Sequence, residues 1–131
     1  MTVITPARID LTIYQGATYW QEWTWLDSNQ DPIDLSNYIG RMQIREDVES
    51  ATVLMEILST GAADKKIYIG GKVAADPTLG IYGVWISAAL TAAIDFESGV
   101  YDLELEDQNG FVRRIQEGKV KISPEVTRPQ V

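Results

Sequence analysis

The 131-residue sequence contains no cysteine and no histidine. Without cysteine there is neither a disulfide framework nor a thiolate metal site. Without histidine the sequence lacks the most common general base and the most common metal ligand, so every histidine-dependent catalytic triad or zinc site is excluded. Carboxylate-only chemistry, such as glycoside hydrolysis by paired acids, stays open because the separation of two carboxylates cannot be read from a sequence.

Basic residues are also scarce: there are 11 against 19 acidic residues, and the formal net charge is −8. A nucleic-acid-binding protein needs basic surface to displace counterions from phosphates, so we expect no nucleic-acid partner. No apolar run approaches the roughly 20 residues of a membrane span, and the first residues lack the basic and apolar regions of a signal peptide. These absences predict a protein that begins in a cytoplasm and has no membrane partner.

The clearest local pattern runs from residue 100 to residue 122. Apolar and acidic residues alternate there with the period of a strand that has one buried face, with Tyr101, Leu103 and Leu105 against Asp102, Glu104 and Glu106. Asn109-Gly110 predicts a tight hairpin turn, since this pair readily adopts positive φ angles. The partner strand is expected over 111–116 and again over 119–122, and we interpret Gly118 between them as a bulge or a bend.

Further strands are expected at residues 8–14, 17–26, 39–45, 52–58, 66–69 and 81–86. Residues 87–94 are rich in alanine and begin with Ser87, a residue that caps helices, so they predict a helical turn. Short strands with a turn about every ten residues indicate an all-β fold, an antiparallel β-sandwich of the immunoglobulin-like or jelly-roll-like type with one short helical crossover. The predicted domain spans 8–122, and residues 1–7 and 123–131, which contain proline, are expected to be extended arms.

Residues 17–26 carry aromatic side chains on both faces of the expected strand. Trp23 and Trp25 share a face with Tyr19, whereas Trp20 lies opposite with Leu26. In one interpretation one face packs in the core and Trp20 lies under a loop or an edge. In the other, one face docks a partner, because exposed aromatic residues are enriched at interfaces.

Two clusters contain the oxygen ligands that calcium prefers, but neither has the spacing of a calcium loop. One consists of Glu104, Glu106, Asp107 and Asn109, and the other of Asp27, Asn29 and Asp31, followed by Pro32 where the loop glycine belongs. Gly70-Gly71-Lys72 lacks the frame of a phosphate-binding loop. The one basic cluster is expected to pair across the hairpin with acids that include Glu104 and Glu106, and it consists of Arg113, Arg114, Lys119 and Lys121. We therefore predict no catalytic residue, no cofactor, no metal ion and no enzymatic activity.

Four stretches carry a wider pattern: ARIDLTIYQGATYWQEWTW (7–25), DPIDLSNYIGRMQIR (31–45), SGVYDLELEDQNGFVRRIQEG (98–118) and KVKISPEVTR (119–128). Together they resemble small structural proteins of tailed phages and prophages. They are similar to the N-terminal β-sandwich domain of baseplate upper proteins, which attaches receptor-binding fibres to the tail. The resemblance implies a virion component that has no active site. Such a protein is assembled in the host cytoplasm, in several copies, against other tail, fibre or capsid proteins.

Three functions follow as hypotheses. The first is a tail or baseplate adaptor that joins fibres to the tail, with extended arms adding to the sheet edges of neighbours. Its expected partner-binding residues are Ile4, Pro6, Trp20, Pro124, Val126 and Arg128. The second is a capsid decoration (cement) protein. The third is a carbohydrate-binding module that uses Trp20, Trp23, Trp25 or Trp85 as a sugar platform.

Overall fold

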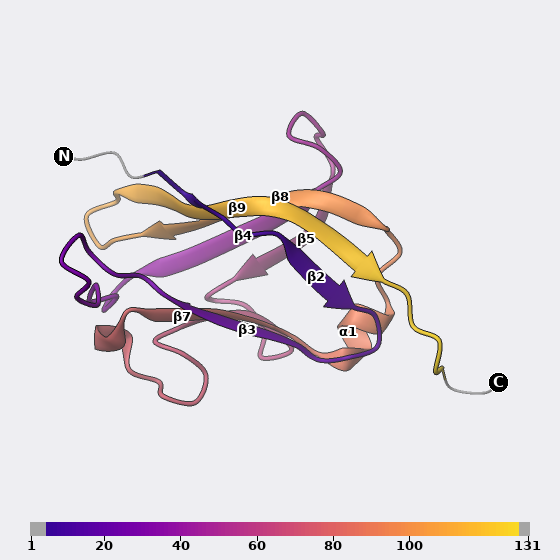
Figure 1. Cartoon of the computed structure of the whole chain (residues 1–131), viewed down its shortest axis with the longest axis horizontal. Helices are drawn as coiled ribbons and strands as arrows, with labels where there is room; N and C mark the ends of the chain where they lie inside the picture. Colours follow the sequence, from indigo (N-terminus) through magenta and orange to yellow (C-terminus); the bar gives the residue numbers. More distant parts are fainter. Residues whose placement is uncertain (1–4, 129–131) are drawn as a thin grey trace.

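The computed structural model describes residues 5–128 and places their strands in two sheets that pack face to face (Figure 1). The larger sheet has the order β1-β9-β8-β4-β5, with β2 also paired to β9. Its strands are β1 (Ala7–Arg8), β2 (Leu11–Tyr14), β4 (Ile39–Arg45), β5 (Val53–Leu58), β8 (Ser98–Glu106) and β9 (Val112–Ser123). The smaller sheet has the order β3-β7-β6 and comprises β3 (Tyr19–Thr24), β6 (Lys65–Ile69) and β7 (Ile81–Ile86).

Two short helices connect the strands. The 3-10 helix η1 (Pro77–Leu79) precedes β7, and the helix α1 (Ala88–Ala92) crosses from β7 in the smaller sheet to β8 in the larger one. The Ser87 hydroxyl caps α1 by accepting a hydrogen bond from the Leu90 amide at 3.3 Å. The all-β sandwich with one helical crossover is therefore confirmed. Its strand order matches the immunoglobulin-like alternative, because β4, β5, β8 and β9 correspond to strands C, C′, F and G of one sheet, and β3, β6 and β7 correspond to strands B, D and E of the other.

The N-terminal strand departs from the prediction in two ways. It pairs in parallel with β9, from Ala7 opposite Gln116 to Tyr14 opposite Ser123, so the sandwich is not purely antiparallel. It is also interrupted at Ile9 and Asp10, where the Asp10 carboxylate accepts the Lys119 amide at 2.9 Å in place of a ladder bond.

Gly118 makes the close approach at this interruption possible. A Cβ atom at Gly118 would collide with the Ile9 carbonyl oxygen. The interpretation of Gly118 as a bulge is wrong, since it pairs in register with Tyr101. The irregularity in the β8–β9 ladder lies earlier, where Leu103 pairs with Gln116 and Glu104 with Arg114, which leaves Ile115 as the extra residue.

The hairpin turn between β8 and β9 is built around one aspartate. The Asp107 carboxylate accepts the amides of Asn109 and Phe111 at 2.9 and 3.0 Å, and Gly110 has a φ of 84°. The predicted hairpin is thus present, with Gly110 alone of the Asn-Gly pair at a positive φ. The loop after β3 is stabilised in the same way, because the Asp27 carboxylate accepts the amides of Asn29 and Asp31 at 2.8 and 3.0 Å.

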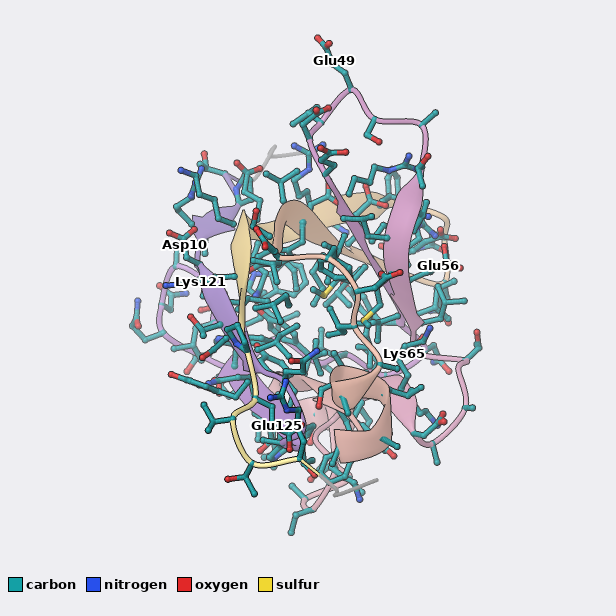
Figure 2. The ribbon with its side chains drawn as sticks, turned by 90° about the vertical axis from the view of Figure 1, so that its right-hand side faces the viewer. Asp10, Glu49, Glu56, Lys65, Lys121 and Glu125 are labelled. Carbon is teal, nitrogen blue, oxygen red and sulfur yellow. The ribbon has the colours of Figure 1, made fainter. Side chains whose placement is uncertain are left out.

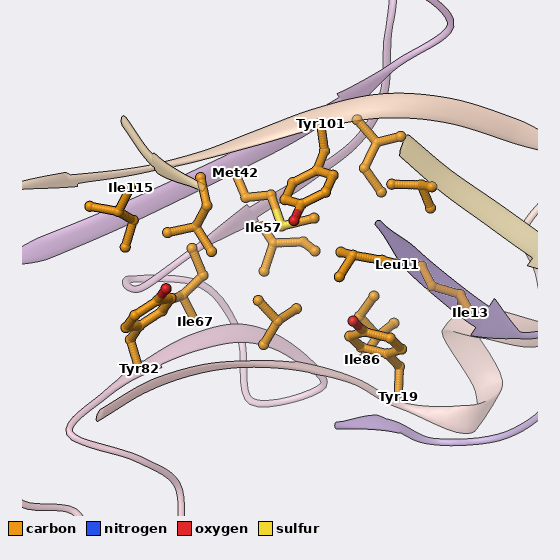
Figure 3. Packing of buried hydrophobic residues seen from close by; sticks show 14 of the residues in the cluster. Leu11, Ile13, Tyr19, Met42, Ile57, Ile67, Tyr82, Ile86, Tyr101 and Ile115 are labelled. Carbon is orange, nitrogen blue, oxygen red and sulfur yellow. The ribbon is translucent and has the colours of Figure 1, made fainter. Parts of the chain in front are cut away.

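The core lies between the two sheets, and Figure 3 shows side chains from both meeting there. The alternation expected in β4 and β8 is confirmed: Met42, Ile44, Tyr101, Leu103 and Leu105 are buried. The bulge at Ile115 shifts the alternation of β9, so that both Ile115 and its neighbour Gln116 are buried. A fully buried glutamine in an apolar core needs hydrogen-bond partners for its amide.

Gln116 finds those partners in two tyrosines from opposite sheets. The Tyr82 hydroxyl donates to Gln116 Oε1 at 2.6 Å, and Gln116 Nε2 donates to the Tyr101 hydroxyl at 2.9 Å. The Tyr101 hydroxyl in turn donates to the Ile9 carbonyl oxygen at 2.6 Å. In Figure 3 Tyr82 extends from the smaller sheet and Tyr101 from the larger one. This chain of hydrogen bonds therefore ties both sheets to the N-terminal segment.

Candidate functional site

The outer face of the smaller sheet carries three aromatic side chains around one glycine. In the strand register Trp20 of β3 lies opposite Trp85 of β7, and Tyr68 of β6 lies opposite Gly83 of β7. Residues paired in this way point to the same face of a sheet. The inward positions of β7 are taken by Tyr82, Val84 and Ile86, all buried, which leaves Gly83 and Trp85 facing outward.

The Trp20 ring contacts the other two rings, and the three form what we call the aromatic platform (Trp20, Tyr68 and Trp85). The Trp20 centroid lies 6.0 Å from that of Tyr68, with the rings edge to face, and 5.8 Å from that of Trp85. Gly83 leaves room for the arrangement, because a Cβ atom there would lie 2.8 Å from Cη2 of Trp20. All three rings are half-buried, so each keeps part of its surface open to solvent.

Two lysines extend over the aromatic platform. Lys72 Nζ lies 4.7 Å from the Trp85 centroid and 5.5 Å from the Tyr68 centroid, and Lys66 Nζ lies 5.3 Å from that of Tyr68. All three distances fall within the range of cation–π attraction. Within residues 5–128 neither ammonium group has a carboxylate within ion-pair distance. The exposed Glu22 carboxylate on the same face accepts only the Lys72 backbone amide, at 3.3 Å.

The structure separates the four tryptophans that the sequence offered as a sugar platform. Trp20 and Trp85 come together on the outer face, and Trp20 lies on the opposite face to Trp23, as the alternation predicts. Trp23 and Trp25 point the other way: Trp23 packs on Tyr82 at a centroid distance of 5.6 Å, and both lie against the core. Tyr68, Lys66 and Lys72 were missed, although Lys66 and Tyr68 alternate with Ile67 and Ile69 in a strand that was predicted.

The outer face of the larger sheet is different, because its charges are paired with one another. Arg41 Nε and Nη1 donate to Glu104 and Glu106 at 2.9 and 3.0 Å. Arg114 lies 3.4 Å from Asp102 and 3.3 Å from Glu117. The expected cross-hairpin pairing is therefore made by Arg114 with Asp102 and by Arg113 with Asp107, whereas Glu104 and Glu106 pair with Arg41 on the other side of β8.

A polar cavity of about 320 Å³ opens on this charged face, between the first strand and the loop that joins β4 to β5. Its walls include Arg8, Arg45, Asp102 and Arg114. Burial raises the pKa of Asp102, and the nearby Arg114 opposes that rise. Arg45 and Arg114 in its walls already bond to groups of the protein itself.

The predicted arm residues Pro6 and Pro124 lie at opposite ends of the stretch of β9 that pairs with the N-terminal strand, and Figure 1 shows β9 along the long axis of the molecule. Pro6 precedes the pairing of Ala7 with Gln116, and Pro124 follows the pairing of Tyr14 with Ser123. Ile4 lies outside the described residues. The structure thus brings neither Pro6 nor Pro124 to the aromatic platform of Trp20.

The segment after β9 is anchored at Glu125 and exposed to solvent at residues 126–128. The Gln15 side chain accepts the Glu125 amide at 3.2 Å, and the Glu125 carboxylate lies against Gly16. Figure 2 shows Glu125 just beyond the end of β9. Val126, directly after this anchor, is 90% exposed, and Arg128 is exposed as well. An exposed apolar side chain next to an anchored residue offers a ready contact for another protein.

No group of three or more acidic side chains comes together as a metal site within the described residues. The carboxylates of Asp27 and Asp107, candidates from the sequence, instead accept backbone amides in their turns. None of the helices in residues 5–128 has the length and apolar character needed to cross a membrane. No family model and no curated protein matches this sequence.

Proposed function

We propose that this chain is a non-enzymatic structural protein of a tailed-phage particle, a β-sandwich adaptor that joins fibres to the tail. Support comes from the sequence pattern shared with baseplate upper proteins, which runs through β2, β3, β4, β8 and β9. The sandwich suits such a role because its core is formed by side chains from both sheets and leaves the outer faces and loops for contacts. The protein would be present in several copies, bound to other virion proteins.

The observation that carries the proposal is the exposed Val126 directly after the anchor at Glu125. The contacts of Glu125 with Gln15 and Gly16 fix the direction in which the chain leaves β9. A partner that covers Val126 then loses less conformational entropy than one that captures a free segment. Pro124 and Arg128 flank this position, so all three predicted residues of the segment are available to the same partner.

A cryo-EM reconstruction of the phage particle that contains this protein tests the proposal. Density for the sandwich at the tail tip or collar, with residues 124–128 against a neighbouring chain, supports the adaptor. Density across the capsid lattice replaces it with a capsid decoration protein. Absence of the chain from the particle overturns both.

Two matched variants test the role of Val126 itself. Val126→Asp places a charge in the proposed contact, whereas Val73→Asp changes a valine that is also 90% exposed but lies in the loop between β6 and η1. If Val126 is buried by a partner, its replacement lowers incorporation into particles by about tenfold or more, from the lost burial of one valine. Equal incorporation of both variants, measured by quantitative mass spectrometry of purified particles, contradicts the assignment.

A further inference from the structure

We infer that the aromatic platform, with Lys66, Lys72 and Glu22, is a binding site for an acidic saccharide. The inference concerns the outer face of the smaller sheet and does not depend on the adaptor role. It replaces the four-tryptophan platform suggested by the sequence, because Trp23 and Trp25 pack toward the core. The new site combines two tryptophans with a tyrosine, two cations and one carboxylate.

The outer faces of the two sheets carry different kinds of side chain. On the larger sheet, arginines and acids are hydrogen-bonded across the strands, as expected of a solvated surface. On the smaller sheet the outward-facing positions hold Trp20, Tyr68 and Trp85, whose rings are partly exposed to solvent. Contiguous aromatic surface on an otherwise charged protein marks a site of contact. The C–H face of a pyranose ring is apolar and flat, and it packs well on such rings.

Charge determines the kind of saccharide. The protein carries a net charge of −8, yet the two lysines over the platform have no carboxylate partner within the described part of the chain. Lys72 Nζ rests instead 4.7 Å from the Trp85 centroid. A lysine side chain is flexible and its ammonium group is a compact donor, so it can turn from the ring to an anionic group on a bound sugar. The local charge is therefore complementary to carboxylate, sulfate or phosphate substituents.

Glu22 adds a hydrogen-bond acceptor for sugar hydroxyl groups to the rings and the two lysines. Its exposed carboxylate lies opposite Gly83 in the strand register, beside the rings, and accepts a single backbone amide at 3.3 Å. The remaining acceptor positions of the carboxylate are open to sugar hydroxyl groups. Stacking surface, cations and a hydroxyl acceptor thus lie on one face, within the span of the three short strands.

The size of the face favours a saccharide over a protein. Three strands of five or six residues give a face of about 20 Å by about 10 Å, from a rise of about 3.3 Å per residue and a strand spacing of about 4.8 Å. The resulting area, roughly 200 Å², is far below the roughly 800 Å² that each partner buries in a standard protein interface. It suits two or three sugar rings.

Binding to immobilised polysaccharides tests the inference, with polygalacturonate and hyaluronan as carboxylate probes, heparin as a sulfate probe, teichoic acid as a phosphate probe and dextran as a neutral control. The expected result is binding to at least one acidic polymer, with no binding to dextran, and weaker binding at high salt. The polymers that bind show whether the site prefers carboxylate, sulfate or phosphate groups. Absence of binding to all four acidic polymers up to about 1 mM repeating unit, or equal binding to dextran, overturns the inference.

Matched variants locate the site. Trp20→Ala and Lys72→Gln are each expected to weaken binding by about tenfold or more. Tyr14→Ala removes an aromatic side chain that is 62% exposed on β2, and Lys121→Gln removes a lysine on β9; neither should alter binding. Figure 2 shows Lys121 on the flank formed by the larger sheet, where it pairs with Thr12 of β2.

Urea unfolding of each variant separates loss of the site from loss of the fold. Lys72 is an exposed loop residue, so Lys72→Gln keeps the test decisive even where Trp20→Ala unfolds the protein. Undiminished binding by a folded Lys72→Gln variant, or equal loss in Lys121→Gln, would refute the assignment.

Discussion

Replacing Gln116 with leucine should destabilise the fold far more than the loss of one polar side chain suggests. Gln116 is fully buried and joins Tyr82 of the smaller sheet to Tyr101 of the larger one, at 2.6 and 2.9 Å. Leucine has a similar volume, so the packing is largely kept. The hydroxyl of Tyr82 is then left as a buried donor without an acceptor, which is the expensive outcome when one partner of a hydrogen bond is removed.

The expected loss of unfolding free energy follows from the buried polar groups that each substitution leaves unpaired. An unsatisfied buried donor costs about 1–3 kcal/mol, so we expect Gln116→Leu to lower the free energy of unfolding by about 2–3 kcal/mol once the bond to Tyr101 is included. Tyr82→Phe alone should cost about 1–2 kcal/mol, because it leaves Gln116 Oε1 unpaired. The double variant removes both partners, so its cost should fall short of the sum by about 1–2 kcal/mol.

Urea denaturation monitored by circular dichroism measures these free energies, and unchanged m-values would show that the unfolding reaction is the same. Tyr19→Phe is the matched control, because the buried Tyr19 hydroxyl has no hydrogen-bond partner among residues 5–128. Because this variant removes a buried hydroxyl that is already unsatisfied, we expect it to leave the free energy of unfolding unchanged or to raise it, by at most about 1–3 kcal/mol. Strict additivity of Tyr82→Phe and Gln116→Leu, or a Tyr19→Phe cost equal to that of Tyr82→Phe, would refute the reasoning.

Two further predictions concern pH and the N-terminal segment. Burial raises the pKa of Tyr101 from 10.0 to about 12, and it raises the pKa values of Tyr19 and Tyr82 as well. The free energy that these protonated phenols contribute to folding should therefore be fully present below pH 10. Above pH 10 it should fall by about 1.4 kcal/mol per pH unit for each phenol, until the pKa of that phenol in the folded state is passed. Urea unfolding at pH 9, 10 and 11 measures the slope, and a flat profile would contradict it. Gly118→Ala should cost about 2–3 kcal/mol because its methyl group would displace the Ile9 carbonyl. It should also speed amide hydrogen exchange in residues 7–14, whereas Gly110→Ala, at a position with open space but a φ of 84°, should leave that exchange unchanged.

Local alternation was enough to predict most strands and their faces. The strands at 39–45 and 81–86 have the predicted bounds, and Trp20 lies on the opposite face to Trp23 as expected. This works because successive side chains of a strand point to opposite sides, which depends only on neighbouring residues. The sequence also indicates an interruption within β9, but it points to Gly118, whereas the extra residue in the structure is Ile115.

Pairing between distant segments could not be predicted in this way. The contact of β2 with β9 joins residues far apart in the sequence, and nothing in the pattern of 8–14 distinguishes a parallel from an antiparallel partner. The aromatic platform depends on the same kind of information, since Tyr68 and Lys72 reach Trp20 and Trp85 only through the order β3-β7-β6. The burial of Gln116 required both the bulge and the opposing Tyr82.

The parallel pairing of the first strand with β9 also determines how the domain resists mechanical tension. A force that pulls the chain before Ala7 and the chain after Ser123 apart slides β1 and β2 along β9, because the chain enters and leaves at opposite ends of this pair. The hydrogen bonds between the strands are then loaded in shear and resist together, instead of opening one after another as in a zipper. The bond from Tyr101 to Ile9 and the bond from Lys119 to Asp10 add to the same resistance. In single-molecule stretching the domain should hold until this patch breaks as a unit, and unfold in one step.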